Sequence, residues 1–536
     1  MGVGRTRAEG AIGVRFLPYR LFICLALWLS ASFLSNVYAL DSLAKPPAPQ
    51  VLLPLEQNGY TRISHSFEVS RYLQFLARTY PEARYETLGK SVQGRVVDAL
   101  IVARNTVSAR DRAADDRAAN NPTPTHITVM LVGGQHGAAE PATTEAMLSI
   151  AKEVLSGDLN FLLDTITLIL IPNVNPDGRD LGYRSNANHV NINTDFVRLE
   201  QPESQVLVDA LNHFQPDVVL DSHESAVLKV KSLAKQGFLT DFYAQFEGAN
   251  NPALPTMTRQ WLTEQILPEL IQRTTRQGLP ANRYIGEITS IHQPITDGGL
   301  TVRNFRNRVG LSGVLSFLLE TRLDSKLGDY PSYRNIRARV QRQLVCLRIF
   351  LEVVHAQREA FKAQVLALRT AEVTEPQSVR LSARYVLDKR HPQVAIPLRR
   401  LDDQQLQTLI FADHRALHFG PSLQVPRYYA VTAHQQKIAE YLQKNHIRYD
   451  VLTSPREVDA EINQYRRSQG AEATLAKSRR ELRRIAAGSL WVDLSQPLAR
   501  LAMVLLDPRS SSSVFLAPDY APLWAPDQDF FILAVP

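Results

Sequence analysis

Two histidines and one glutamate in this sequence are of the types that hold a metal ion together. His136 is followed four positions later by Glu140, and His223 lies further along the chain. Two imidazoles and one carboxylate are the protein ligands of an open catalytic zinc site, in which water takes the fourth position. A further carboxylate, Glu320, ends an apolar run, where burial is costly unless the acid is paired or faces a cleft. These residue types predict a metal site with a second acid beside it.

Three short apolar runs precede these side chains and must position them. They are His126–Val132, Asp217–Asp221 and Gly313–Leu319, and each is typical of a buried strand. In α/β proteins the carboxyl ends of the strands form the edge where ligands bind. We therefore expect the three runs to deliver their functional groups to one edge of a sheet. For Glu140 alone, a plainer interpretation is a carboxylate that is favourable at a helix start.

Strands and helices alternate through the first two thirds of the chain. Further strands are predicted at Val96–Ala103 and Thr165–Ile171, and the polar stretch Asn105–Pro124 is interpreted as an exposed loop. The alternation predicts an α/β fold, a three-layer α/β/α sandwich with a mixed, mostly parallel sheet. The predicted helices are Pro141–Leu155, Glu203–Phe214, Arg259–Gln277 and Tyr333–Leu368.

The character of the sequence changes from about Glu375 onward. We interpret this part as a smaller C-terminal accessory α/β domain without a catalytic cluster. Its predicted strands are Val425–Thr432, Ile447–Leu452 and Leu490–Leu494, and its predicted helices are Gln435–Lys444 and Arg466–Ala486. The predicted organisation is therefore a signal peptide at 1–39, a catalytic domain at 45–372 and the accessory domain at 373–536.

Composition indicates an ordinary globular protein. The chain has 536 residues, 45% hydrophobic and 21% charged, with a net charge of +7. Removal of the N-terminal segment would leave a surplus of about four, which is mild. No block of basic residues is interleaved with aromatics, so we expect no nucleic-acid partner. Of the two cysteines, Cys24 lies in the N-terminal run, and Cys346 is expected to be a buried small hydrophobe.

The N-terminus has the features of an export signal. Arginines precede an apolar run, Leu21–Leu34, and the small-residue site Val37–Ala39 follows it. The run is shorter than the roughly 20 apolar residues that a membrane span needs. We expect an exported protein, periplasmic or secreted, with no membrane span after signal removal. An uncleaved anchor is the alternative interpretation.

A series of short motifs follows in a fixed order along the chain. The motifs are Gln135-His136-Gly137, Glu140-Pro141-Ala142, Asn175-Pro176-Asp177-Gly178, Tyr183-Arg184, Asn193-Thr194-Asp195, Asp221-Ser222-His223-Glu224 and Glu320-Thr321-Arg322. Singly each motif is weak, but their order is specific. The series resembles the zinc carboxypeptidase family, the carboxypeptidase A-type metallopeptidases, and specifically its bacterial exported branch. The resemblance covers roughly Thr61 to Arg369, and the C-terminal part is similar to the tail of some bacterial members.

The resemblance implies a role for each matching position. His136, Glu140 and His223 would bind one zinc ion per chain. Glu320 would be the general base that takes a proton from zinc-activated water. The roles it implies for the remaining positions are oxyanion stabilisation by Arg184 and binding of the substrate's terminal carboxylate by Asn193. For Asp221 two interpretations stand equally: a residue that orients a metal ligand, or a turn former at the end of a strand.

Two departures from the family pattern bear on function. Three residues separate His136 from Glu140, where the family has two. Thr194 stands where the family has an arginine that grips the substrate carboxylate, and a hydroxyl cannot replace a bidentate guanidinium. Arg306 is the first candidate to substitute for it, with Arg308 and Arg198 as others. Tyr284 is the nearest candidate for the family's substrate-covering tyrosine, and an ordinary interface aromatic is the plainer interpretation of this residue.

The leading hypothesis is a metallocarboxypeptidase that hydrolyses C-terminal peptide bonds. Its substrates would be peptides, and the sequence does not specify an oligomeric state. The substitution at Thr194 motivates a second hypothesis, a zinc amidase or deacylase acting on cell-wall peptides or N-acyl amino acids. The longer spacing before Glu140 motivates a third, a non-catalytic binding protein on the same scaffold.

Overall fold

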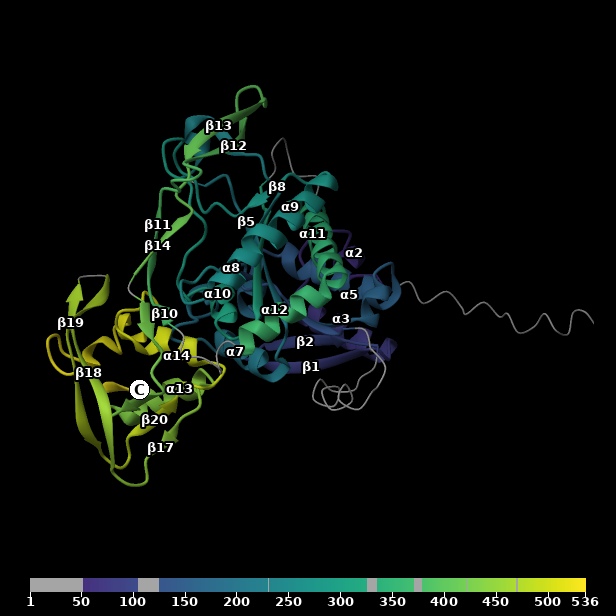
Figure 1. The fold of residues 1–536 in the computed structure, drawn as a ribbon. Coiled ribbons are helices and arrows are strands. Elements are labelled where there is room, and N and C mark those ends of the chain that lie inside the picture. The colour runs from purple at the N-terminus through teal and green to yellow at the C-terminus, as the bar shows by residue number, and fades with distance from the viewer. Residues whose placement is uncertain are drawn as a thin grey trace, which may run out of the picture. The chain divides into compact units, whose positions relative to one another are not determined.

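The computed structural model describes residues 52–536 apart from 105–124, 230, 325–334, 371–377, 421 and 469–470 (Figure 1). The predicted signal peptide at 1–39 and the predicted loop Asn105–Pro124 lie outside the described residues. Leu52–Pro536 form one compact unit.

A mixed eight-stranded sheet carries the predicted site. Its strand order is β1-β2-β4-β3-β5-β9-β7-β8. The central strands β4, β3, β5 and β9 run parallel to one another, and β2 and β7 flank them in the antiparallel direction. The predicted mixed, mostly parallel sheet is therefore confirmed. The strands are β1 Ala83–Lys90, β2 Val96–Val102, β3 Ile127–Val132, β4 Ile166–Ile171, β5 Val218–Ser225, β7 Ala244–Gly248, β8 Ala281–Arg283 and β9 Leu315–Arg322.

Helices cover both faces of this sheet. On one face, Met130 and Val219 of the central strands pack in a buried cluster with residues of α7 and α10, such as Val309. On the other face, Phe317 of β9 packs against Phe350 of α11 and Phe361 of α12. The three-layer arrangement is thus confirmed. The helices of this part are α2 Pro54–Gln57, α3 Ser66–Thr79, α5 Ala142–Ser156, α6 Pro176–Leu181, α7 Pro202–Phe214, α8 Thr256–Trp261, α9 Leu267–Arg276, α10 Phe305–Gly310, α11 Ile336–Ala356 and α12 Arg358–Thr370.

The long helix predicted at Tyr333–Leu368 is two helices in the structure. The chain leaves helical geometry at Gln357, between α11 and α12. This break lets Phe350 and Phe361 approach the same ring, Phe317, from two directions. Cys346 of α11 is buried, as predicted. Within the described ranges, no helix is both long enough and apolar enough to cross a bilayer.

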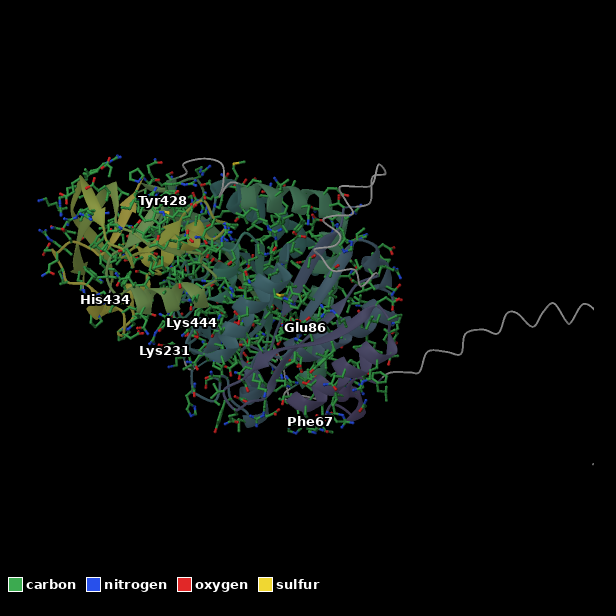
Figure 2. The ribbon with its side chains drawn as sticks, turned by 90° about the horizontal axis from the view of Figure 1, so that it is seen from below. Phe67, Glu86, Lys231, Tyr428, His434 and Lys444 are labelled. Carbon is green, nitrogen blue, oxygen red and sulfur yellow. The ribbon has the colours of Figure 1, made fainter. Side chains whose placement is uncertain are left out.

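The C-terminal part forms a second sheet, with the order β17-β20-β16-β21-β18-β19. In Figure 2, Tyr428 marks the start of β16 and Lys444 the end of α13. The helix predicted at Arg466–Ala486 is wrong, because this stretch forms the end of β18 and all of β19. Its arginines and glutamates favour helices, but β19 is an edge strand whose polar side chains can face solvent. The elements are β16 Tyr428–Val431, α13 Gln435–Lys444, β17 Asp450–Val451, β18 Arg456–Ser468, β19 Ala471–Ile485, β20 Leu490–Asp493, α14 Ala499–Leu506 and β21 Ile532–Val535.

A ribbon of paired strands, residues 378–424, connects the two sheets along the chain, and we call it the arm. Its strands pair as β10 with β15, β11 with β14 and β12 with β13. Strand β12 also pairs with β6, Phe238–Thr240, from the first part of the chain. The strands are β10 Ser378–Arg380, β11 Ala383–Val386, β12 Gln393–Arg400, β13 Leu406–Ala412, β14 Ala416–Phe419 and β15 Ser422–Gln424.

Candidate active site

The turn after β3 brings His136 and Glu140 together. Residues Gly137–Ala139 form a single 3₁₀ turn, which accommodates the three residues between them. Gly137 has a φ of +48°, and a Cβ at this position would lie 2.6 Å from the backbone of Gly178 and 2.7 Å from the carbonyl oxygen of Tyr183. The turn therefore packs backbone against backbone, and only glycine fits at its first position.

His136, Glu140 and His223 form one buried cluster. Their ligand atoms all lie within 4.8 Å of one another. The Nδ1 atom of His223 lies 3.0 Å from Oε2 of Glu140, and the Nε2 atom of His136 lies 4.0 Å from Oε1. Each of the three side chains is at most 4% exposed. The three predicted ligands are thus brought together from the turn after β3 and from strand β5, which are far apart in the sequence.

The donor set of this cluster fits a zinc ion. The Nδ1 atom of His136 is buried and has no hydrogen-bond partner among the described residues, so a lone pair is available there. Burial lowers the pKa of His136 to about 3, which keeps the imidazole neutral, as metal binding requires. Burial alone would raise the pKa of Glu140, but His136, His223 and Arg184 outweigh it and hold the pKa low. The imidazole of His136 and the carboxylate of Glu140 are therefore in the protonation states that a zinc ion prefers.

Asp221 lies beside the imidazole of His223. Its Oδ2 atom lies 3.0 Å from Nε2 of His223, and its Oδ1 atom accepts a hydrogen bond of 2.6 Å from Gln135. Burial alone would lower the pKa of His223, but Asp221 and Glu140 raise it well above its ordinary value. The ring of His223 therefore presents Nδ1 to Glu140. The carboxylates of Asp221 and Glu140 favour the protonated, positively charged form of this ring. A carboxylate behind a metal-binding histidine is a common means of fixing its orientation.

The sequence did not reveal the side chains that hold β5 in place behind the cluster. Gln343 of α11 donates to the carbonyl oxygen of His223 at 2.6 Å and accepts from the hydroxyl of Ser222 at 2.8 Å. Glu224 is buried, and its carboxylate pairs with Arg339 of α11 at 2.7 Å. A glutamine and an arginine within a predicted helix carry no local pattern that distinguishes them from surface residues, so only the fold reveals their role.

Glu320 lies beside the cluster on the neighbouring strand. It is the register partner of His223 in the parallel pair β5–β9, and of Gln245 in the antiparallel pair β7–β9. Its Oε2 atom is buried and has no hydrogen-bond partner within the described part of the chain. Burial raises the pKa of Glu320 to about 8, opposed by His223 and reinforced by Glu140. A carboxylate with this pKa can both accept and return a proton near neutral pH.

Arg184 contacts the cluster, and Tyr284 lies next to strand β7, the neighbour of the strand that carries Glu320. The guanidinium of Arg184 is 53% exposed and donates to Glu140. The backbone nitrogen of Tyr284 donates to the carbonyl oxygen of Phe246 in β7 at 2.9 Å. Burial raises the pKa of the Tyr284 phenol, and the charge of Glu320 raises it further. Arg184 is therefore a solvent-exposed cation beside a buried carboxylate of the cluster.

The three predicted substrate-binding residues, Asn193, Thr194 and Arg306, lie in different environments. Asn193 lies at the site, because its Nδ2 atom is 3.3 Å from Nε2 of His223. Thr194 is exposed, and its hydroxyl donates to the carbonyl oxygen of Asn191. Arg306 is only 4% exposed and forms an ion pair with Glu247, so the structure does not bring its guanidinium to the cluster.

The other two arginines considered as substitutes are also engaged elsewhere. Arg308 is buried and donates to Oδ1 of Asn445 at 2.6 Å. Arg198 pairs with Glu200 and Asp519. The sequence did not distinguish these structural arginines from a substrate-binding one, because Asn445 and Asp519 lie far along the chain from the arginines that they contact.

The chain is similar in sequence to known carboxypeptidases. Residues 69–223 match the family model for zinc carboxypeptidases. The chain is 28% identical to Carboxypeptidase 2 of Trichophyton rubrum over 262 residues, which is 47% of this chain and 45% of that protein. It is 27% identical to Carboxypeptidase D of Mus musculus over 180 residues, which is 29% of this chain and 12% of that protein. The resemblance to the zinc carboxypeptidase family is thus confirmed, while the chain spans less than half the length of these relatives.

Solved structures of carboxypeptidases also align with this chain. A metallo-carboxypeptidase from Burkholderia cenocepacia is 20% identical, with a TM-score of 0.41 over 56% of this chain and 71% of that one. Carboxypeptidase A from Helicoverpa armigera is 16% identical, with a TM-score of 0.40 over 63% of this chain and 82% of that one.

Proposed function

We propose that the chain is a zinc-dependent metallocarboxypeptidase that hydrolyses C-terminal peptide bonds. The observation that carries this proposal is the register of Glu320 with His223. It sets a carboxylate of raised pKa beside a buried cluster of two imidazoles and one carboxylate. The family match over residues 69–223 supports the same chemistry.

The residues of the site have complementary tasks in such a reaction. Zinc, when bound by His136, Glu140 and His223, supplies a Lewis acid that activates water and polarises the scissile carbonyl. Glu320 accepts the proton of the attacking water and returns it to the leaving amine. The guanidinium of Arg184, at the mouth of the site, donates hydrogen bonds to the oxygen on which negative charge develops.

The substrate's terminal carboxylate requires donors near Asn193. The Oδ1 atom of Asn193 accepts from the backbone nitrogen of Phe305 at 2.8 Å, and Thr194 is exposed beside it. Arg303 is also exposed, and its carbonyl oxygen accepts from Phe196 at 3.3 Å, which holds its backbone next to this segment. We therefore assign carboxylate binding to Asn193, Thr194 and Arg303, and a supporting role to the buried Arg306.

A mass-spectrometric time course tests the proposed activity. The purified protein with zinc is mixed with unblocked peptides, C-terminally amidated peptides and cell-wall-type peptides, with and without a chelator. Stepwise loss of residues from free C-termini that stops with the chelator is the expected result. Absence of cleavage of every peptide in the presence of zinc would contradict the proposal and favour a non-catalytic binding protein.

An amidase or deacylase is the second candidate, because Thr194 stands where the family arginine would be and Arg306 is paired with Glu247. A site without a guanidinium at that point would tolerate substrates that lack a free terminal carboxylate. Cleavage confined to amidated or cell-wall-type peptides in the same time course would favour this candidate.

Export and domain organisation complete the proposal. Arginines before the apolar run Leu21–Leu34, and the site at Val37–Ala39, support a signal peptide at 1–39 and a periplasmic or secreted protein. We further propose a catalytic domain at 45–372 and an accessory domain at 373–536. Amino-terminal sequencing of the exported protein should begin at Leu40; a chain that retains Met1 would contradict signal removal.

A further inference from the structure

We propose that Tyr385 of the arm is a positioning residue for substrate binding, because it fixes a segment that borders the active site. The segment is Tyr284–Gly299, which we call the wall segment. This inference rests on the proposed function for its effect on catalysis, and it assigns a role to a part of the chain that contains no catalytic cluster of its own.

The wall segment starts beside Glu320. The backbone nitrogen of Tyr284 donates to the carbonyl oxygen of Phe246 at 2.9 Å, and that of Ile285 donates to Oε1 of Gln245 at 3.3 Å. Gln245 is the register partner of Glu320 on the neighbouring strand. A displacement of the start of the wall segment would therefore be transmitted to the carboxylate of Glu320 through the paired strands β7 and β9.

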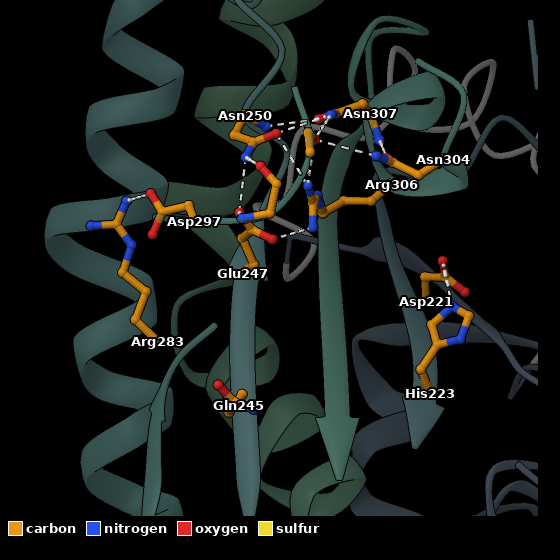
Figure 3. A network of polar contacts seen from close by, with 12 residues as sticks. Asp221, His223, Gln245, Glu247, Asn250, Arg283, Asp297, Asn304, Arg306 and Asn307 are labelled. Carbon is orange, nitrogen blue, oxygen red and sulfur yellow. Dashed lines mark hydrogen bonds and ion pairs between the residues drawn. The ribbon is translucent and has the colours of Figure 1, made fainter. Parts of the chain in front are cut away.

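The wall segment ends in a buried polar network (Figure 3). The backbone nitrogen of Gly298 donates to Oε1 of Glu247 at 2.8 Å, and the carbonyl oxygen of Gly299 accepts from Arg306 at 3.2 Å. Glu247 and Arg306 pair with each other, and Figure 3 shows Asn250 beside both of them. Both ends of the wall segment are thus held against strand β7 and helix α10.

This network is connected to the metal cluster through α10. Phe305, next to Arg306, donates its backbone nitrogen to Oδ1 of Asn193, and Nδ2 of the same Asn193 lies 3.3 Å from His223. The position of Arg306 is therefore coupled to a side chain that we assign to substrate binding.

The arm covers the middle of the wall segment. Ile295 exchanges backbone hydrogen bonds with the arm, donating to Ala412 at 2.9 Å and accepting from His414 at 2.8 Å. Ile285, Ile288 and Ile295 are buried in one apolar cluster with side chains of the arm. The arm members of this cluster are Ile396, Leu398 and Phe411, joined by the partly buried Val394 and Leu409. The cluster also contains Leu233 and Phe242, so the arm supplies part of the apolar cover over the three isoleucines.

Tyr385 joins the arm to the polar end of the wall segment. Its hydroxyl donates to the carbonyl oxygen of Gly298 at 2.6 Å and accepts from Nδ2 of Asn250 at 3.0 Å. Burial and the carboxylates of Glu247 and Asp297 raise the pKa of Tyr385, so the hydroxyl stays protonated and able to donate. One hydroxyl therefore links the arm, the wall segment and the network around Arg306.

The test compares Tyr385→Phe with Tyr449→Phe in the full chain with zinc. Tyr449 is the matched control, because its hydroxyl accepts from Gln443 in the C-terminal sheet region, and the same atom is removed there. We expect Tyr385→Phe to raise KM by about 3- to 10-fold, the range that one lost hydrogen bond produces. The kcat and the zinc content should stay close to those of the unsubstituted protein, and Tyr449→Phe should change neither constant.

Hydrogen exchange supplies a second readout that does not depend on turnover. Amides of residues 285–299 should exchange faster in Tyr385→Phe, whereas those of β5 and β9 should not change. Phe411→Leu, which loosens the arm from its apolar side, should give the same pattern. Unchanged exchange in 285–299, or faster exchange with an unchanged KM, would overturn the inference. If the unsubstituted protein cleaves no peptide, the proposed function fails, and exchange alone decides whether Tyr385 fixes the wall segment.

Discussion

His223 and Glu320 are register partners in two adjacent parallel strands, so their side chains leave the same face of the sheet at the same level. This relationship explains how a metal ligand and a proton acceptor come to share one site although 96 residues separate them along the chain. It also predicts that the two side chains can be altered separately, because the backbone of each strand is held by other contacts.

Asp221→Asn should weaken zinc binding without unfolding the protein. The substitution keeps the shape of the side chain but removes the charge behind His223, whose Nε2 atom lies 3.0 Å away. Loss of such a partner typically costs about 10- to 100-fold in metal affinity. Competition with a zinc indicator measures the change. Asp519→Asn, in an exposed ion pair with Arg198, is the control, and equal affinities in the two variants would contradict this role.

Gly137→Ala should destabilise the protein and its metal site together. A Cβ at this position would overlap the backbone of Gly178, in addition to the cost of a positive φ, which is about 1–2 kcal/mol. Gly182→Ala is the matched control, because Gly182 has a φ of +81° but open space around its Cβ position. Thermal unfolding should show a lower Tm for Gly137→Ala than for Gly182→Ala, and equal values would contradict the packing of the turn.

The metal-free protein should lose stability as the pH rises from about 4.5 to 8 through Glu320. Burial raises the pKa of this group to about 8 in the folded state, above its ordinary 4.5. The folded state then binds the proton more tightly than the unfolded state, so ionisation disfavours folding across this interval. Denaturant unfolding in the presence of a chelator should show a smaller decline in Glu320→Gln than in the unsubstituted protein. The same decline in both would refute the raised pKa.

Arg184→Ala should lower kcat while leaving the zinc content unchanged. Its guanidinium is half exposed at the mouth of the site and is not one of the three ligands. Removal of one oxyanion donor costs about 100- to 1,000-fold in kcat in well-studied hydrolases. Equal kcat values for Arg184→Ala and the unsubstituted protein would contradict the oxyanion role of Arg184.

Arg303→Ala should raise KM instead of lowering kcat, because we assign Arg303 to substrate binding.

The strands that carry the site could be predicted because each is a short apolar run ending in a histidine or a carboxylate. The cluster of His136, Glu140 and His223 followed from the ordered motifs, and the structure brings its members together. Glu320 could be placed beside them because parallel strands end at one edge of a sheet.

The remaining features of the fold and the site could not be predicted, because they depend on contacts between residues that are distant in the sequence. The arginine-rich stretch Arg466–Ala486 has the composition of a helix, yet strand pairing determines its conformation. The predicted substrate arginine, Arg306 of α10, is buried because Glu247 of strand β7 neutralises it. The contact of Tyr385 with Gly298 joins residues 87 positions apart, and no local sequence pattern predicts this contact.

The role of Glu320 as the general base of a zinc-dependent peptide hydrolase is tested by removal of its charge. The kcat on an unblocked peptide and the zinc content are determined for Glu320→Gln and for Glu264→Gln, which alters an exposed glutamate. We expect Glu320→Gln to bind zinc as the unsubstituted protein does but to lose turnover by at least about 100-fold, the lower end of general-base contributions. Glu264→Gln should keep both properties. Full turnover by Glu320→Gln with zinc bound would contradict a general-base role for Glu320.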